Sequence, residues 1–131
     1  LYVSGECGIA RWNEDASTWE YLPKGFPSPD KPPAILNLVV HRGRLFAGLR
    51  THGVYLFDTR TQTWRTAGLE GFTVYGIVSH QSSLYAAAGQ TDKDGTRTIG
   101  GIYRTTTIAG VHPHAKAAAT WGRLKRGGLA K

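Results

Sequence analysis

The sequence is poor in the residues that define several large protein classes. It has no methionine and a single cysteine, Cys7, among 131 residues. One cysteine excludes an intramolecular disulfide framework and any zinc or iron–sulfur site built from several cysteines. No apolar run approaches the roughly 18 residues that a membrane-spanning helix needs, and the first residues lack the pattern of a signal peptide. The sequence therefore predicts neither a disulfide-rich scaffold nor a membrane span.

Acidic residues are absent from the last part of the chain. The formal net charge is +7, from 16 bases and nine acids. All nine acids lie in residues 1–94 and are balanced there by nine bases, whereas residues 95–131 carry seven bases and no acid. Beyond Trp121 no aromatic residue is interleaved with these bases, which does not favour specific nucleic-acid binding. Residues 125–131 are interpreted as a basic tail or linker.

What the chain does contain is an internal repeat. Three alternating segments each begin at a glycine and are each followed by a Thr-Trp pair. The glycines, 45 and 48 residues apart, are Gly8, Gly53 and Gly101. The tryptophans are Trp19, Trp64 and Trp121. A period of this length indicates a repeat architecture in which each unit is one supersecondary motif.

Each repeat unit is interpreted as four short β-strands, because apolar and polar residues alternate and turn residues separate the segments. The first strand is predicted at 36–41 and 74–79, and the second at 1–4, 45–48 and 84–88. The third is predicted at 8–12, 53–57 and 101–105, and the fourth begins at each tryptophan. Four strands in about 45 residues are typical of a β-propeller blade. We therefore predict an all-β protein with about three propeller blades, the first lacking its first strand.

The predicted blades divide the chain into five parts. These are a partial blade at 1–24, a Pro-rich crossover at 25–35, a blade at 36–69, a blade at 70–124 and the tail. Two loop insertions are expected in the third blade, at 90–99 and 108–119. Because propellers have about four to eight blades, we expect the chain to belong to a larger ring or to complete one by self-association.

Several residues of the repeat are interpreted as structural. A glycine before the third strand suits a turn with positive φ or a close approach of backbone. A tryptophan that opens the fourth strand can pack as a wedge between neighbouring sheets. Asp58 ends the alternating strand of the second unit and joins this structural set.

The repeat resembles known propellers. Residues 45–64, Leu-Phe-Ala-Gly-Leu-Arg-Thr-His-Gly-Val-Tyr-Leu-Phe-Asp-Thr-Arg-Thr-Gln-Thr-Trp, resemble a blade of the kelch or two-component-regulator propeller superfamily. Residues 1–19 are similar to repeats of secreted bacterial propellers, which favours an extracellular or periplasmic location. The sialidase Asp-box is not matched, because Asp58 lies six residues before Trp64 with no glycine between them. The resemblance thus implies a fold and leaves the activity open.

Candidate binding residues lie on the first strands and in the loops, where propellers carry their specificity. The candidates for ligand binding are His41, Arg42, Arg44, Tyr75 and His80. The candidates for loop recognition are Asp92, Asp94, His112 and His114. No metal site or cofactor is predicted, because the two histidines lack a third ligand and residues 97–103 add no acid to the two aspartates.

These features predict a recognition or scaffold module that binds a protein, peptide or glycan through its loops. Catalysis is left open but not favoured, since no nucleophile-elbow pattern is present. One alternative is part of a propeller hydrolase or lyase whose site lies at the central mouth of the ring. A second alternative is a sensor segment of a larger signalling protein.

Overall fold

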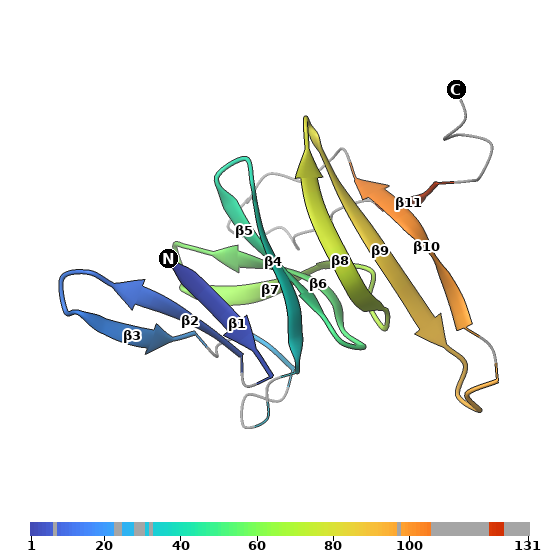
Figure 1. Ribbon diagram of the computed structural model, residues 1–131, viewed down its shortest axis with the longest axis horizontal. Helices are drawn as coiled ribbons and strands as arrows, with labels where there is room; N and C mark the ends of the chain where they lie inside the picture. Colours follow the sequence, from blue (N-terminus) through green and yellow to red (C-terminus); the bar gives the residue numbers. More distant parts are fainter. Residues whose placement is uncertain are drawn as a thin grey trace.

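The computed structural model describes residues 1–6, 8–22, 25–27, 31, 33–96, 98–105 and 121–124. These residues form three antiparallel β-sheets, and none of them forms a helix that could cross a membrane (Figure 1). The first sheet holds β1 (Tyr2–Gly5), β2 (Gly8–Asn13) and β3 (Thr18–Tyr21). The middle sheet holds β4 (Ile35–His41), β5 (Arg44–Leu49), β6 (Gly53–Asp58) and β7 (Thr63–Gly68). The last sheet holds β8 (Thr73–His80), β9 (Ser83–Thr91), β10 (Thr98–Thr105) and β11 (Gly122–Arg123).

Each sheet is a meander in which consecutive strands are hydrogen-bonded neighbours. The orders are β1-β2-β3, β4-β5-β6-β7 and β8-β9-β10-β11. These strands confirm the all-β fold and the strand segments predicted from the three repeat units. The register places corresponding residues opposite each other, with Trp12 paired to Trp19 in the first sheet and Phe57 paired to Trp64 in the middle sheet.

The last sheet departs from the sequence interpretation between strands β9 and β10. The sequence predicts an insertion loop over 90–99, whereas the two strands stay paired as far as Thr91 and Thr98. Only the tip is a turn, where the Gly95 amide donates to the Asp92 carbonyl at 2.9 Å. Gly95 has φ +74°, a value that suits glycine. Within 90–99, residues 90–91 and 98–99 therefore belong to the paired strands, and residues 92–96 form the hairpin tip.

The middle sheet is buried on both faces because the other two sheets pack against it. Alternate side chains of a strand point to opposite faces, so β5 and β6 contribute to two separate cores. The core shared with the first sheet contains Ile9, Leu22, Phe26, Ile35, Leu45, Ala47, Leu49, Tyr55, Phe57 and Trp64. The core shared with the last sheet contains Phe46, Val54, Leu56, Ala67, Val74, Ile77, Leu84, Ala86, Ala88 and Tyr103. All six residues of β6 are consequently buried.

The sheets also meet along their first strands, β1, β4 and β8. Strand β4 contacts both β8 and β1. The Asn37 side-chain amide donates to the Val74 carbonyl at 2.9 Å, which ties β4 to β8. Gly48 permits this approach, because a Cβ there would lie 2.7 Å from a methyl carbon of Val74. The three sheets thus follow one another along the chain, with the first and last at opposite ends (Figure 1).

Candidate functional site

Four of the five predicted ligand residues, His41, Arg42, Arg44 and His80, lie at one rim of the sheets, where β4 and β8 end, but they have different environments. His41 is 2% exposed, and its Nδ1 lies 2.7 Å from the Ser79 hydroxyl oxygen. Burial, with a smaller contribution from the Arg42 charge, lowers the pKa of His41 below its ordinary value. The ring is therefore neutral near pH 7, and it links the ends of β4 and β8.

The other predicted ligand residues lie on the surface. Arg42 is exposed in the β4–β5 turn, where its φ is +49°, and Arg44 is half-buried. His80 is exposed, with its ring centroid 6.5 Å from that of Tyr85. On the other side of strand β9, the Arg104 guanidinium carbon lies 5.8 Å from the same Tyr85 centroid. The structure thus adds an arginine–tyrosine pair to this rim that sequence reasoning missed.

Tyr75 and the loop candidates lie elsewhere. Tyr75 is exposed on β8, and its ring lies over Gly89, where a Cβ would be 3.5 Å from it. Asp92 and Asp94 are exposed at the tip of the β9–β10 hairpin, and Asp94 accepts hydrogen bonds from the Thr96 amide and hydroxyl. These bonds lower the pKa of Asp94. His112 and His114 lie outside the described residues.

A polar hollow lies at the opposite rim, between the first and middle sheets. Its volume is about 290 Å³. It is lined by Glu6, Lys31, Pro33, Ala34, Arg50, Thr51 and His52. Two cationic side chains, a hydroxyl, an imidazole and one carboxylate therefore share one concave surface. Such a mixture of donors and acceptors suits a polar ligand.

Three hydrogen bonds, each with at least one backbone group, hold the walls of this hollow in place. The Arg50 amide donates to the Ala34 carbonyl at 3.0 Å, joining the crossover to the β5–β6 turn. The Thr51 amide donates to the Thr73 hydroxyl at 3.1 Å. His52 is held through its Nδ1, which lies 2.9 Å from the Arg50 carbonyl oxygen. The Pro-rich crossover was the available sequence signal for this hollow, but sequence alone could not pair it with residues 50–52.

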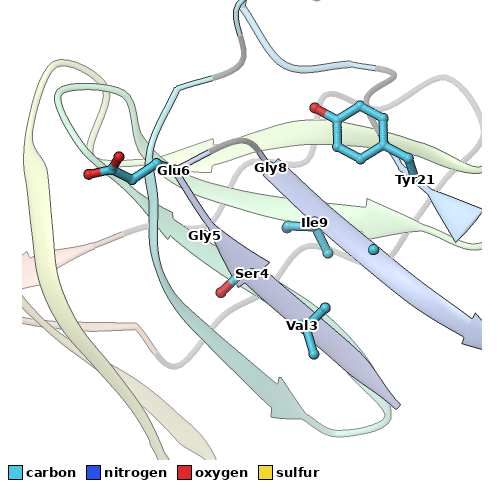
Figure 2. Close-up of a pocket in the computed structure, with 8 residues that line it drawn as sticks. Val3, Ser4, Gly5, Glu6, Gly8, Ile9 and Tyr21 are labelled. Carbon is cyan, nitrogen blue, oxygen red and sulfur yellow. The ribbon is translucent and has the colours of Figure 1, made fainter. Parts of the chain in front are cut away.

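A second hollow, of about 340 Å³, opens on the first sheet (Figure 2). It is lined by Val3, Ser4, Gly5, Glu6, Gly8, Ile9, Ala10 and Tyr21. Most of its wall is apolar, and its side chains come from β1, β2 and the end of β3. The Tyr21 ring lies against Gly8, since a Cβ on that glycine would be 2.6 Å from the tyrosine hydroxyl. The hollow therefore offers an apolar surface instead of a set of reactive groups.

The predicted structural glycines are not equivalent. Gly8 and Gly53 begin β2 and β6 with φ of +117° and +77°, as the turn argument predicts. Gly101 instead lies inside β10, because the longer hairpin moves the start of that strand to Thr98. A Cβ on Gly101 would lie 2.6 Å from the Arg123 side chain, so its role is close packing.

Asp58 caps the turn between β6 and β7. Its Oδ1 accepts hydrogen bonds from the amides of Arg60 and Thr61, and its Oδ2 pairs with Arg65. Burial alone would raise the pKa of Asp58, but these amides and the Arg65 charge outweigh it and lower the pKa. In the first sheet, Asn13 occupies the same repeat position and accepts from the Ala16 amide.

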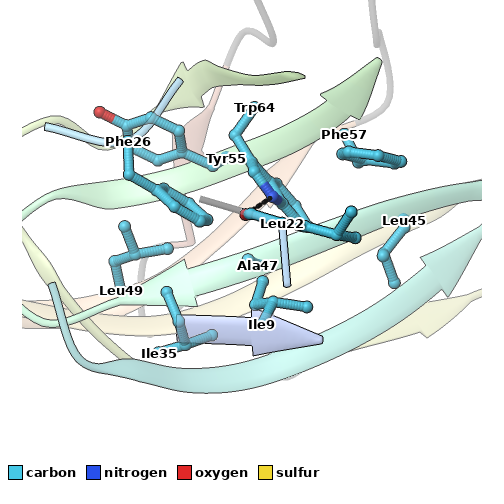
Figure 3. Packing of buried hydrophobic residues seen from close by; sticks show 10 residues of the cluster. All are labelled: Ile9, Leu22, Phe26, Ile35, Leu45, Ala47, Leu49, Tyr55, Phe57 and Trp64. Atoms are coloured by element: carbon cyan, nitrogen blue, oxygen red, sulfur yellow. Dashed lines mark hydrogen bonds between the residues drawn. The ribbon is translucent and has the colours of Figure 1, made fainter. Parts of the chain in front are cut away.

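The tryptophans make a repeated contact between sheets. Trp64 donates from Nε1 to the Leu22 carbonyl at 3.2 Å, as Figure 3 shows, and Trp121 donates to the Ala67 carbonyl at 2.8 Å. Leu22 follows Trp19 by three residues, and Ala67 follows Trp64 by three. Each bond therefore joins a tryptophan to the same position of the preceding repeat unit. Two of the three predicted tryptophan wedges thus pack between sheets.

The described residues contain no group of three His, Cys, Asp or Glu side chains arranged to hold a metal ion. Comparisons with protein-family models, curated proteins and solved structures find no match to the chain. The candidate site consequently rests on the geometry of the two hollows and the two rims.

Proposed function

We propose that the chain is a recognition module of the β-propeller type, and that the polar hollow binds a peptide or glycan segment bearing an acidic group. The observation that carries this proposal is the position of Lys31 and Arg50 on the wall of one hollow. An arginine can bind a carboxylate through two parallel hydrogen bonds, while Thr51 and His52 offer further polar contacts. Glu6, which also lines the hollow, can accept a hydrogen bond from a ligand hydroxyl or amide.

The arrangement of the sheets supports the propeller part of this proposal. Three consecutive meanders pack in sequence, and the strands that open the second and third units lie in contact. The same tryptophan hydrogen bond joins each sheet to the one before it. Radial repetition of a four-stranded meander is the architecture of a propeller.

The test is binding of the full chain to arrays of acidic and neutral peptides and of acidic and neutral glycans, followed by NMR titration of the ¹⁵N-labelled protein with the best ligand. We expect the largest shift changes at Glu6 and at residues 50–53. The substitution Arg50→Ala should weaken binding about tenfold or more, a loss of roughly 1.4 kcal/mol. Arg60→Ala, at an exposed arginine on the opposite rim, is the matched control and should leave affinity unchanged. Binding that survives Arg50→Ala, or shifts confined to the other rim, would contradict the proposal.

A second candidate function rests on the His41–Ser79 pair. A neutral, buried imidazole at 2.7 Å from an exposed serine hydroxyl can act as a general base toward that serine, which would suit an esterase-like hydrolase. A fluorophosphonate probe tests this directly. If Ser79 is a nucleophile, the probe labels the wild-type chain and Ser82→Ala but not Ser79→Ala. Absence of labelling, or labelling that persists in Ser79→Ala, would exclude this role.

A further inference from the structure

The outer face of the first sheet carries apolar side chains at positions that are buried in the middle sheet. By repeat position, Leu1, Val3, Trp12 and Trp19 correspond to Leu45, Ala47, Phe57 and Trp64. The four middle-sheet residues lie in the core shared with the first sheet. Trp64 is 2% exposed, whereas Trp19 is 47% exposed. The outer face of the first sheet thus corresponds to the face of the middle sheet that packs against the first sheet.

The outer face of the last sheet corresponds to the other face of the middle sheet, the one that packs against the last sheet. Its side chains are those of Val78, Tyr85, Ile102, Arg104 and Leu124, which correspond to Val39, Phe46, Val54, Leu56 and Ala67 of the middle sheet. The middle-sheet residues pack against the last sheet. In the last sheet, Val78 and Ile102 are exposed. The two ends of the described structure therefore carry the two halves of one kind of interface.

We propose that the outer face of the first sheet binds the outer face of the last sheet of a second copy of the chain, head to tail. In this contact the Trp19 indole donates from Nε1 to the Leu124 carbonyl of the second copy. Leu124 follows Trp121 by three residues, as Leu22 follows Trp19 and Ala67 follows Trp64. The contact repeats a geometry that the chain already makes twice.

The apolar hollow of the first sheet fits this arrangement. In the two internal interfaces, an aromatic residue that follows the fourth strand packs on a tyrosine of the next sheet. The ring pairs are Phe26 with Tyr55 and Phe72 with Tyr103, at 5.5 and 5.6 Å. The first sheet has Ala10 at the position of these tyrosines, and Ala10 lines the hollow. The hollow thus lies where a preceding sheet would insert an apolar group.

An arginine on the outer face of the last sheet does not prevent this packing. Arg104 corresponds to Arg11 of the first sheet, and Arg11 shares the face of Ile9 that packs on the middle sheet. There Arg11 pairs with Glu20 at 2.7 Å. An arginine at this repeat position is therefore already part of an interface between two sheets.

Charge favours a second copy as the occupant. Residues 1–24 contain four acids (Glu6, Glu14, Asp15 and Glu20) and two bases (Arg11 and Lys24), a net charge of −2. Residues 95–131 have a net charge of +7. Among the described residues, the first sheet and its turns carry four acids and one base, while β10 and β11 carry Arg104, Arg123 and no acid. Head-to-tail contact therefore brings opposite net charges together, whereas pairing two first sheets would bring like charges together. Two copies contribute six sheets, a number within the range of about four to eight blades in closed propellers.

Native mass spectrometry and light scattering of the full chain test the proposal. We expect a dimer of twice the chain mass, and we expect raised salt to increase its dissociation constant. Trp19→Ala and Ile102→Glu should each raise the dissociation constant at least tenfold. Ile99→Glu is the matched control, because Ile99 lies on the same strand and is equally exposed (43% against 41% for Ile102) but faces the opposite side. Circular dichroism verifies that each variant is folded.

A mixture of two variants distinguishes head-to-tail contact from other dimers. When the two variants are mixed, the unsubstituted last sheet of Trp19→Ala can bind the unsubstituted first sheet of Ile102→Glu. The mixture should therefore form a dimer that neither variant forms alone. A chain that stays monomeric at high micromolar concentration overturns the proposal. That result is expected if a further repeat of a longer polypeptide, instead of a second copy, covers the face. A dimer weakened equally by Ile99→Glu, or one that the mixture does not recover, also overturns it.

Discussion

Trp64 and Trp19 occupy the same position of the repeat, yet they lie in opposite environments. Both open a fourth strand, and both pair with an aromatic residue of the preceding strand. Trp64 is buried between two sheets and donates a hydrogen bond to Leu22, while Trp19 lies on an outer face and meets the Trp12 ring at 5.3 Å. Strand formation therefore follows from the local sequence, whereas burial depends on whether another sheet is present.

The largest effect is expected from truncating the buried member of this pair. Trp64→Ala should lower the free energy of unfolding by about 4 kcal/mol, because it opens a cavity between the first and middle sheets. Trp19→Ala should cost less than about 1 kcal/mol in the monomer, since that side chain is already half in solvent. Urea unfolding followed by circular dichroism measures both, at concentrations where the chain is monomeric. Equal losses would show that the two positions are energetically alike.

The next effect concerns the glycines that open the third strands. Gly53→Ala should cost about 3 kcal/mol, because φ is +77° and the new Cβ would lie 2.3 Å from the Leu69 carbonyl oxygen. Gly8→Ala should cost about 1.5 kcal/mol, since its Cβ would meet the Tyr21 side chain, which can move, and the remaining strain comes from φ. Thermal unfolding of the two variants gives the comparison. A larger loss at Gly8 would show that the first sheet is the more rigid of the two.

A smaller effect is expected at the capped turns. Asp58→Ala should lower stability by about 2 kcal/mol, since it removes the carboxylate that accepts hydrogen bonds from two backbone amides and leaves Arg65 without its buried carboxylate partner. Asn13→Ala should cost about 1 kcal/mol, because its turn is exposed and the Asn13 side chain accepts a hydrogen bond from one backbone amide, that of Ala16. Chemical denaturation measures both losses. If the asparagine variant loses more, the Asn13–Glu20 hydrogen bond matters more than the turn cap does.

The smallest expected effect is a dependence on pH that arises in the middle sheet. The pKa of His41 is lower in the folded chain than its ordinary value of about 6.5. The unfolded state therefore binds a proton at a higher pH than the folded state, so stability is fully present above about 6.5 and falls as pH drops below it. Unfolding free energies at pH 7.5 and 5.5 measure this slope. His41→Asn removes the titrating group and should flatten the profile, and an unchanged slope would place its origin elsewhere.

Strand positions were predictable because they depend on residues close together in sequence. The alternation in residues 53–57, the glycine that begins it and the Thr-Trp pair that follows were enough to predict β6 and β7, and the structure confirms them. Residues 90–99 were interpreted as a loop insertion, so the strand pairing of 90–91 with 98–99 was not predicted, although Asp-Gly residues are typical of a hairpin turn. Ring closure stays a prediction.

The candidate site was less accessible to sequence reasoning. His41 and Ser79 are 38 residues apart, and only the packing of β4 against β8 brings them within 2.7 Å. The polar hollow likewise joins Lys31 to Arg50 across two elements that no local pattern connects. The predicted binding residues on the first strands stay predictions, with His41 buried and Tyr75 exposed on a different face.

The all-β fold, the repeat period and the glycines that begin two of the third strands could be read from the sequence alone, because φ preference and alternation act over a few residues. The packing of the sheets determines which of the three equivalent tryptophans is buried, which carbonyl accepts its hydrogen bond and which loops form a hollow. These outcomes depend on contacts between sheets, and a sheet's own sequence does not specify whether its outer face has a neighbour.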